Sequence, residues 1–367
     1  MTDGRGRRTE DLNAISMKAG VGMIELKNDR LVFSFPEVHA AARVEIEFQR
    51  TLRIPDDGRD YPLPPGLGRF PVAHVDDYAR TVPSEWLKQG GVMLPMYQSE
   101  ALWINFEANE DPERMAEYPF AVKIAAGKIN AVSGGTWQKG LHRKPDQDYV
   151  VIPEQPWLDG FCVEKGIIRQ FVAMPLGSGY SAEEQITGQA ECGGLQIQVF
   201  PMKRSVYEKR FPKQSTSMRG VGNLYMMCEP PMMYSMGLAP GGRMRQNIEA
   251  DPYGIRDWDR GCTGRCFVHI ANSMVWNGIT GKEPPHPPPT AKSYNEAGLP
   301  WFEWYNDNTQ PISGSKTLAK LKSVVTLGEK KKQKPLPENA SVSPGPVIAL
   351  RARMKKGQVR EFKETEV

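Results

Sequence analysis

The stretch "ARVEIEFQRTLRI", residues 42–54, is the clearest alternation of apolar and polar side chains in the chain. One side of the expected strand carries Val44, Ile46, Phe48, Leu52 and Ile54. Arg50 alone interrupts this apolar side. The other side carries Arg43, Glu45, Glu47, Gln49, Thr51 and Arg53. Because successive side chains of a strand point to opposite faces, the pattern predicts an antiparallel sheet with one face in water.

Further strands are predicted on both sides of this stretch. "GMIELK" (22–27) and "RLVFSF" (30–35) are expected to pair as a hairpin around "NDR". Strand-like runs follow within residues 92–133, and 35 glycines with 31 prolines favour short strands joined by many turns. No regular alternation of strand and helix is present. We therefore expect an α+β, β-rich fold of antiparallel sheets, sandwich- or barrel-like, with a few short helices.

Short helices are predicted at a few places between these strands. Ser181 and Glu184 have the spacing of a capping box, which predicts a helix over about 182–187. The segment 313–328 has the strongest helical pattern, with Ser315 as the expected N-cap. Two weaker helices are expected over residues 9–19 and in "EDPERMAEY", residues 110–118.

Four segments are expected along the chain. They are an N-terminal arm with a short helix (1–20), a β-rich half (21–140), an α+β half (141–328) and a basic flexible tail (329–367). The tail holds ten Lys and Arg against five Glu, although the whole chain has a formal net charge of only +4. A nucleic acid or an anionic surface could therefore be contacted only through the tail, and a tail that simply keeps the protein soluble is the favoured alternative.

The composition predicts a soluble, cytoplasmic protein. No apolar segment of a signal peptide follows "MTDGRGRRTEDLNA" at the N-terminus. No run approaches the ~18 apolar residues of a membrane-spanning helix, so no transmembrane segment is expected. The five cysteines are spread too widely to suggest a disulfide framework, which favours a reducing compartment.

The motif "PEQPWLDG" places two carboxylates around an aromatic residue, with Glu154 and Asp159 flanking Trp157. Paired carboxylates beside an aromatic platform are what a glycosidase needs. Cys162 follows closely, and His269 is a base that the fold could bring near it for nucleophilic catalysis. Glu154, Asp159, Cys162 and His269 are therefore the candidate catalytic residues of a hydrolase. The alternative is a buried, unreactive Cys162 and carboxylates without a catalytic role.

Soft metal ions are the next possibility. Cys262, Cys266 and His269 have C-x3-C-x2-H spacing, but zinc sites usually need a second pair, which the sequence lacks. The methionine-rich segment 223–246, which includes Cys228, has ligands that copper(I) prefers. Methionine also fills cores and lines adaptable grooves. We expect no metal site and no cofactor.

Two segments are candidates for binding. The first is the methionine-rich segment, with Met232, Met233 and Met236. In the second, the polyproline run "PPHPPPT" precedes four aromatic residues: Trp301, Phe302, Trp304 and Tyr305. A proline run can dock on aromatic side chains, in this protein or in another. The leading hypothesis is a binding or assembly protein with a protein partner or a second copy of itself, and a hydrolase is the alternative.

Three stretches carry a resemblance to other proteins: residues 153–201, "GLAPGGRMRQNI" (237–248) and "PPPTAKSYNEAGLPWFEWY" (287–305). Together they resemble a group of bacterial and fungal proteins of unknown function, often labelled hypothetical or integral membrane proteins. This resemblance spans about residues 90–325. It implies no activity, cofactor or site residue, and the membrane label finds no apolar segment here that is long enough to span.

Overall fold

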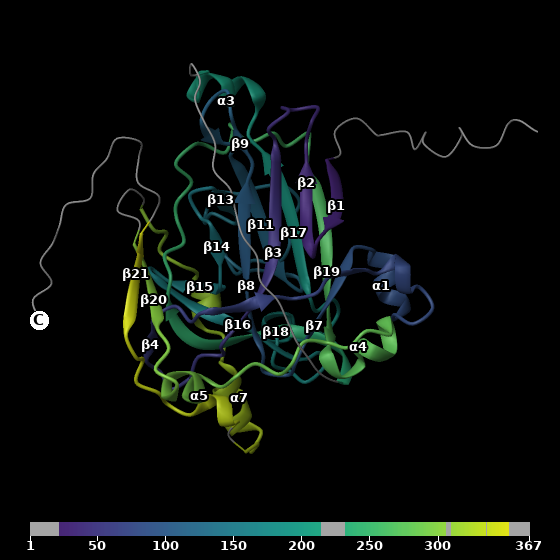
Figure 1. Cartoon of the computed structure of the whole chain (residues 1–367), viewed down its shortest axis with the longest axis vertical. Helices are drawn as coiled ribbons and strands as arrows, with labels where there is room; N and C mark the ends of the chain where they lie inside the picture. The colour runs from purple at the N-terminus through teal and green to yellow at the C-terminus, as the bar shows by residue number, and fades with distance from the viewer. Residues whose placement is uncertain (1–21, 214–231, 306–309, 335, 352–367) are drawn as a thin grey trace, which may run out of the picture.

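The computed structural model describes residues 22–213, 232–305, 310–334 and 336–351, without the side chains of 232–234, 305 and 351. Strands hold 38% of the residues and helices 17%, so the expected β-rich α+β class with antiparallel sheets is confirmed. Figure 1 shows long strands at the centre of the molecule and short helices around its periphery. In the described residues, no helix is long and apolar enough to cross a membrane.

The first layer of the fold contains β3, the strand that the alternation of residues 42–54 predicts. Neighbouring strands pair in the order β1–β2–β3–β8–β16–β18–β4, and every pair is antiparallel except the parallel β18–β4. The expected hairpin is formed by the first two strands. The bounds are β1 Met23–Lys27, β2 Arg30–Ser34, β3 Arg43–Thr51, β8 Ala101–Ala108, β16 Ile167–Pro175, β18 Met232–Arg245 and β4 Asp60–Tyr61. Three short strands extend this layer: β5 Gly66–Arg69, β14 Trp157–Leu158 and β15 Gly160–Glu164.

The second layer runs in the order β13–β11–β17–β19–β7–β6, with β12 beside β11. Ser235 of β18 pairs with Ala271 of β19, which joins both layers into one 17-stranded sheet. Strands from either side of residue 141 pair directly, as β8 does with β14 and β16. The bounds are β6 Ala73–His74, β7 Val92–Met96, β11 Phe120–Ala126, β12 Ile129–Asn130, β13 Val150–Ile152, β17 Leu195–Pro201 and β19 Gly264–Asn272.

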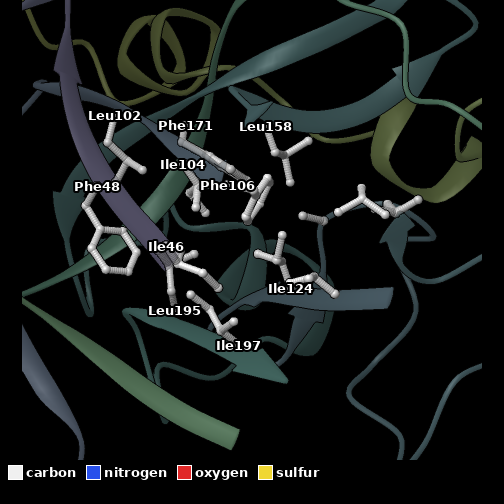
Figure 2. Packing of buried hydrophobic residues seen from close by; sticks show 14 of the residues in the cluster. Ile46, Phe48, Leu102, Ile104, Phe106, Ile124, Leu158, Phe171, Leu195 and Ile197 are labelled. Carbon is white, nitrogen blue, oxygen red and sulfur yellow. The ribbon is translucent and has the colours of Figure 1, made fainter. Parts of the chain in front are cut away.

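The apolar faces of the two layers meet in one core. Figure 2 shows Ile46 and Phe48 of β3 packed near Ile104 of β8, with Ile124 and Ile197 from the second layer close by. All five side chains are fully buried, and so are Val44, Leu52 and Ile54, which confirms the apolar side predicted for residues 42–54. Burial of side chains of this size contributes roughly 1.5–3 kcal/mol each, so this face is a main source of stability.

The polar side of β3 differs from the expected water-exposed face, because other segments cover much of it. The Thr51 hydroxyl donates to the carbonyl of Pro65 over 2.8 Å, and Arg53 donates to the Asn339 side chain over 2.7 Å. Glu47 is also buried, and its carboxylate pairs with a neighbouring arginine. The sequence period marks which residues share a face, but not which distant loop packs on that face.

Arg50, which interrupts the apolar side of β3, forms a buried ion pair with Glu100. Its Nε and Nη2 atoms lie 2.7 and 2.6 Å from Glu100 Oε1, and the two side chains are 6% and 1% exposed. Nη2 also donates to the carbonyl of His286 in the polyproline run, over 2.6 Å. The second carboxylate oxygen accepts from the backbone N–H of Tyr97 over 2.8 Å. Burial raises the pKa of Glu100, while Arg50 and these hydrogen bonds oppose that shift.

The helices confirm one local prediction and correct two. The capping box of Ser181 and Glu184 is present, and α2 spans the predicted residues. The helix expected over 313–328 is instead two helices, although Ser315 does cap the first. They are separated because the Gln185 side chain bonds both backbone groups of Lys322, while Ser323 caps the second helix. The bounds are α1 Ser84–Gln89, α2 Ala182–Thr187, α3 Arg204–Arg210, α4 Ser273–Thr280, α5 Ala291–Glu296, α6 Lys316–Ala319 and α7 Val324–Lys330, with 3-10 turns η1 Asp76–Tyr78 and η2 Pro337–Asn339.

The acidic helix expected over 110–118 is wrong: this stretch is a small hairpin of β9 (Glu110–Asp111) and β10 (Ala116–Glu117). The Asp111 side chain accepts from the N–H of Glu113 over 3.0 Å, which favours a turn over a helix. Arg114 is buried and donates to the carbonyl of Phe211 over 2.5 Å, so tertiary contacts hold this turn.

The described part of the expected flexible tail is folded onto the body. β21 (Val347–Arg351) pairs in parallel with β20 (Trp301–Tyr305), and Figure 1 shows the two strands side by side at one edge of the molecule. Ser341 donates to Asp57 over 2.8 Å, which anchors the preceding segment. The rest of the tail, and the N-terminal arm with its expected helix, lie outside the described residues.

The buried ion pair can be tested by Glu100→Gln, which leaves Arg50 charged and buried without a counter-charge. We expect the free energy of unfolding to fall by about 3–5 kcal/mol, measured by urea denaturation. Glu85→Gln is the control, because Glu85 forms an exposed pair with Lys88 and its loss should leave the denaturation midpoint unchanged. Equal midpoints for the two variants would show that the pair does not constrain the fold.

Candidate functional site

The candidate site begins with residues 246–249, which follow β18. Side-chain amides, not the hydrogen bonds of a regular strand pair, hold these residues in position. Gln155 donates to the carbonyl of Asn247 over 3.2 Å and accepts from the N–H of Glu249 over 3.0 Å. Gln246 donates to Asp159 over 2.7 Å and accepts from the backbone N–H of the same residue over 3.1 Å. Each glutamine side chain thus donates one of these hydrogen bonds and accepts the other, so residues 246–249 form a rigid wall beside β14.

A pocket of about 370 Å³ lies against this wall, and we call it the tryptophan pocket. It collects side chains from five distant parts of the chain: the β4–β5 loop, β14 with the turn before it, the β15–β16 turn, the end of β18 and β20. Its lining includes Leu63, Glu154, Gln155, Trp157, Ile167, Arg245, Gln246, Asn247, Glu249, Glu303 and Trp304. The pocket therefore combines apolar walls with several carboxyl and amide groups.

Two indole rings form adjoining walls of the tryptophan pocket. Trp157 of β14 and Trp304 of β20 have ring centroids 4.8 Å apart, at an interplanar angle of 72°. Trp103 of β8 lies on the other side of Trp157, at 6.3 Å and 74°. Edge-to-face contacts of this kind fix ring orientation and contribute about 0.5–1.5 kcal/mol beyond area burial. The three rings thus form a continuous aromatic row across three strands.

Glu154 carries the main electrostatic feature of the pocket. The Tyr253 hydroxyl donates to its Oε1 over 2.6 Å. Its other oxygen, Oε2, is buried and has no hydrogen-bond partner among the described residues. Burial raises the pKa of Glu154, and the nearby carboxyl groups of Asp251 and Glu117 add to the shift, while Tyr253 and the backbone N–H of Glu154 itself oppose it.

Asp159 lies beneath Trp157 and lines a second, smaller pocket of about 250 Å³, which we call the apolar annex. Burial raises the pKa of Asp159 from 3.8 to about 7, although hydrogen bonds from the Trp157 and Gln246 side chains oppose the shift. The annex shares Leu63 and Trp157 with the tryptophan pocket, and its other walls are Pro64, Pro65, Gly66, Trp103, Phe302 and Leu350. Asp159 therefore positions Trp157 at the boundary between the two pockets.

The structure does not bring Cys162 and His269 into this site. Cys162 is 1% exposed in β15, and burial raises the pKa of its thiol to about 12, which leaves almost no thiolate at neutral pH. His269 lies in β19, where its ring stacks on Trp86 and its Nε2 is 3.0 Å from the Gly90 carbonyl oxygen. Burial lowers the pKa of His269 to about 4. Neither residue is part of the tryptophan pocket lining.

The aromatic candidates have different positions. Trp301 is fully buried, whereas Phe302 lines the apolar annex and Trp304 lines the tryptophan pocket. Tyr305 is in β20, but its side chain is not among those that the structure describes. The structure thus joins part of the aromatic segment to Glu154, a pairing that the sequence pattern did not indicate.

The methionine candidates lie elsewhere. Met236 is 1% exposed and lies on a separate pocket of about 730 Å³, together with Leu176 and Met274. Met232 and Met233 belong to β18, but their side chains lie outside the description, as does Cys228.

The part of the chain that the structure describes contains no cluster of metal-ligating side chains. No group of three or more His, Cys, Asp or Glu side chains there is arranged to hold an ion. Cys262 and Cys266 are both buried free thiols.

Several residues of the site were missed by the sequence analysis. Gln246, Glu249 and Tyr253 follow β18 within a few positions, and Trp103 lies in the middle of β8. The polar run after an apolar strand, in "RQNIEADPY", was the available signal, but it does not show what the run faces. No family model, curated protein or solved structure matches the chain.

Asp159→Asn tests the buried carboxyl group through the pH dependence of stability. The folded state holds the proton of Asp159 up to about pH 7, whereas the unfolded chain releases it near its ordinary value of 3.8. The wild type should therefore lose up to about 4 kcal/mol relative to Asp159→Asn as pH rises from 4 to 7, and the difference should then stay constant.

Chemical denaturation of both proteins between pH 4 and 8 measures this difference. Asp77→Asn, at an exposed carboxylate, should run parallel to the wild type over the same range. A constant difference between the wild type and Asp159→Asn would mean that Asp159 is not protonated in the folded protein at acidic pH.

Proposed function

We propose that this protein binds a small organic ligand in the tryptophan pocket. Its volume of about 370 Å³ lies within the common range for small-molecule sites, roughly 300–1,000 Å³. Such sites combine apolar and aromatic walls with a few convergent polar groups. Trp157 and Trp304 supply the walls, and Glu154, Gln246 and Asn247 supply the polar groups.

The single observation that carries this proposal is the unsatisfied oxygen of Glu154. A buried polar atom without a hydrogen-bond partner costs about 1–3 kcal/mol, and more for a charged group. Each such atom calls for an explanation, such as a bound ligand, an ion or a water molecule. A ligand that donates a hydrogen bond to Oε2 recovers this cost on binding, which a purely structural glutamate would not require.

A thermal-shift screen of a small-molecule library containing amines, sugars and carboxylic acids tests this proposal. Ligands that raise the melting temperature of the wild type should lose most of their effect on Trp304→Ala and on Glu154→Gln, because both changes alter the pocket. Trp137→Ala is the matched control: Trp137 is also half-buried but lies under Arg265, away from this pocket.

Ligands that shift Trp304→Ala and Glu154→Gln as strongly as they shift the wild type would place the binding site elsewhere. A screen in which no compound raises the melting temperature of the wild type would also count against the proposal.

A hydrolase is the second candidate, and one observation favours it. Glu154, whose pKa is raised by burial, shares the tryptophan pocket with a second carboxyl group, that of Glu249. A carboxyl group whose pKa is raised by burial is suited to act as a general acid, and a second one can act as a base or nucleophile. In this hydrolase hypothesis, Asp159 positions Trp157, and Cys162 takes no part in the reaction.

The hydrolase hypothesis is tested with a panel of chromogenic glycosides and esters. If a substrate is turned over, Glu154→Gln should lower kcat by about 10²-fold or more, because general acid catalysis contributes about that much. Cys162→Ala should leave kcat unchanged. Turnover that survives Glu154→Gln, or that is lost in a folded Cys162→Ala protein, contradicts this assignment.

A further inference from the structure

We infer that the tryptophan pocket takes an organic cation, a protonated amine whose apolar part extends into the apolar annex. This inference rests on the proposed binding function and adds the chemical class of the ligand. Four independent features support it: the charge of the lining, the surroundings of Glu154, the angle between two indole rings and the composition of the annex.

The charge of the lining favours a cation. The described lining residues contribute three carboxyl groups, from Glu154, Glu249 and Glu303, and one guanidinium, from Arg245. Arg245 already pairs with Glu303, so it is not poised to neutralise a ligand anion. An anionic ligand would enter a pocket with an excess of acidic groups, at the cost of like-charge repulsion. A cation would reduce the same repulsion.

The surroundings of Glu154 favour a charged donor over a neutral one. Oε2 is a buried acceptor without a partner in the described residues, while Oε1 is held by Tyr253. A hydroxyl group would satisfy Oε2 as a hydrogen-bond donor. An ammonium group would do so and would also neutralise a carboxylate that burial destabilises. Hydrogen bonds between charged partners are roughly twice as strong as neutral ones.

The two indole rings add a second attraction for a cation. Trp157 and Trp304 meet at 72° with centroids 4.8 Å apart, so they form two walls of a corner. The faces of an indole ring are electronegative, and tryptophan is the side chain that binds cations best through its π-system. An ammonium group near this corner therefore gains from both the rings and the carboxylate of Glu154.

The apolar annex shows what the amine is attached to. It adjoins the tryptophan pocket at Leu63 and Trp157, which line both pockets, and its walls include Pro65, Trp103 and Phe302. Asp159, the ionisable group in this lining, is engaged by the Gln246 and Trp157 side chains. An apolar group is therefore the part of a ligand that fits this space, while its ammonium end stays near Glu154.

A set of matched probes tests the inference on the full-length chain. Phenethylamine is protonated at pH 7, as a lysine side chain is, whereas 2-phenylethanol is neutral and phenylacetate is anionic, and all three are similar in size. Ethylamine keeps the ammonium group and lacks the ring. By calorimetry at pH 7, we expect phenethylamine to bind about tenfold more tightly than the alcohol. Phenylacetate should not bind, and ethylamine should bind more weakly than phenethylamine.

Variants assign each part of the ligand to its pocket. Glu154→Gln should bind phenethylamine no better than 2-phenylethanol, whereas Glu110→Gln, at an exposed glutamate outside the pocket, should keep the tenfold preference. Leu350→Ser should weaken phenethylamine by about three- to tenfold and leave ethylamine unchanged. Ile348→Ser is its control, because Ile348 is a comparably exposed apolar residue of β21 that does not line the annex.

The outcomes separate this inference from the proposed function. Equal affinities for the amine and the alcohol, both lost in Trp304→Ala, would leave the binding site in place and overturn the preference for a cation. Tighter binding of phenylacetate, or no binding of phenethylamine at about 10 mM, would also overturn it. An amine preference that persists in Glu154→Gln would place the cation site elsewhere.

Discussion

The buried ion pair of Arg50 and Glu100 is the constraint on which much of the fold depends. It neutralises the one charge on the apolar side of β3 and connects this strand to the turn before β8. The backbone at Glu100 is also joined to β16, because the carbonyl of Glu100 accepts a hydrogen bond from the N–H of Ala173 in that strand. Since β16 pairs with β15 and β8 pairs with β14, the position of Trp157 follows from this junction. A charge inside a core is costly, so a complete set of partners specifies one arrangement of these strands.

The candidate site differs from the Arg50–Glu100 pair in how it balances buried polar groups. In the core, Arg50 and Glu100 have hydrogen-bond partners for their charged groups. Around the tryptophan pocket, burial raises the pKa values of Glu154 and Asp159, and one oxygen of Glu154 has no partner in the described residues. Carboxyl groups with raised pKa values in a concave site, beside fixed aromatic walls, are characteristic of functional sites. The hydrogen bonds of Gln155 and Gln246 hold the wall of residues 246–249 beside these groups.

How far the sequence predicted this protein depends on the range of the interaction involved. The alternation of residues 42–54 and the capping box of α2 are local patterns, and both were predicted correctly. Two helix predictions failed where distant groups compete for the same backbone. Gln185 binds Lys322 and interrupts the helix expected over 313–328, and Arg114 reaches Phe211 and stabilises a turn in place of a helix. Intrinsic propensity is weak enough that one or two tertiary hydrogen bonds override it.

By itself the sequence determined the class of fold, the apolar face of β3 and the closeness of Glu154 and Asp159 to Trp157, because these depend on residues a few positions apart. The tertiary structure alone decided that Trp304 stands beside Glu154, that Cys162 and His269 lie away from them, and that residues 246–249 close the pocket. The contacts within the pocket join parts of the chain that are 87 or more residues apart. They are set by the pairing order of the strands, and a periodic pattern carries no information about that order.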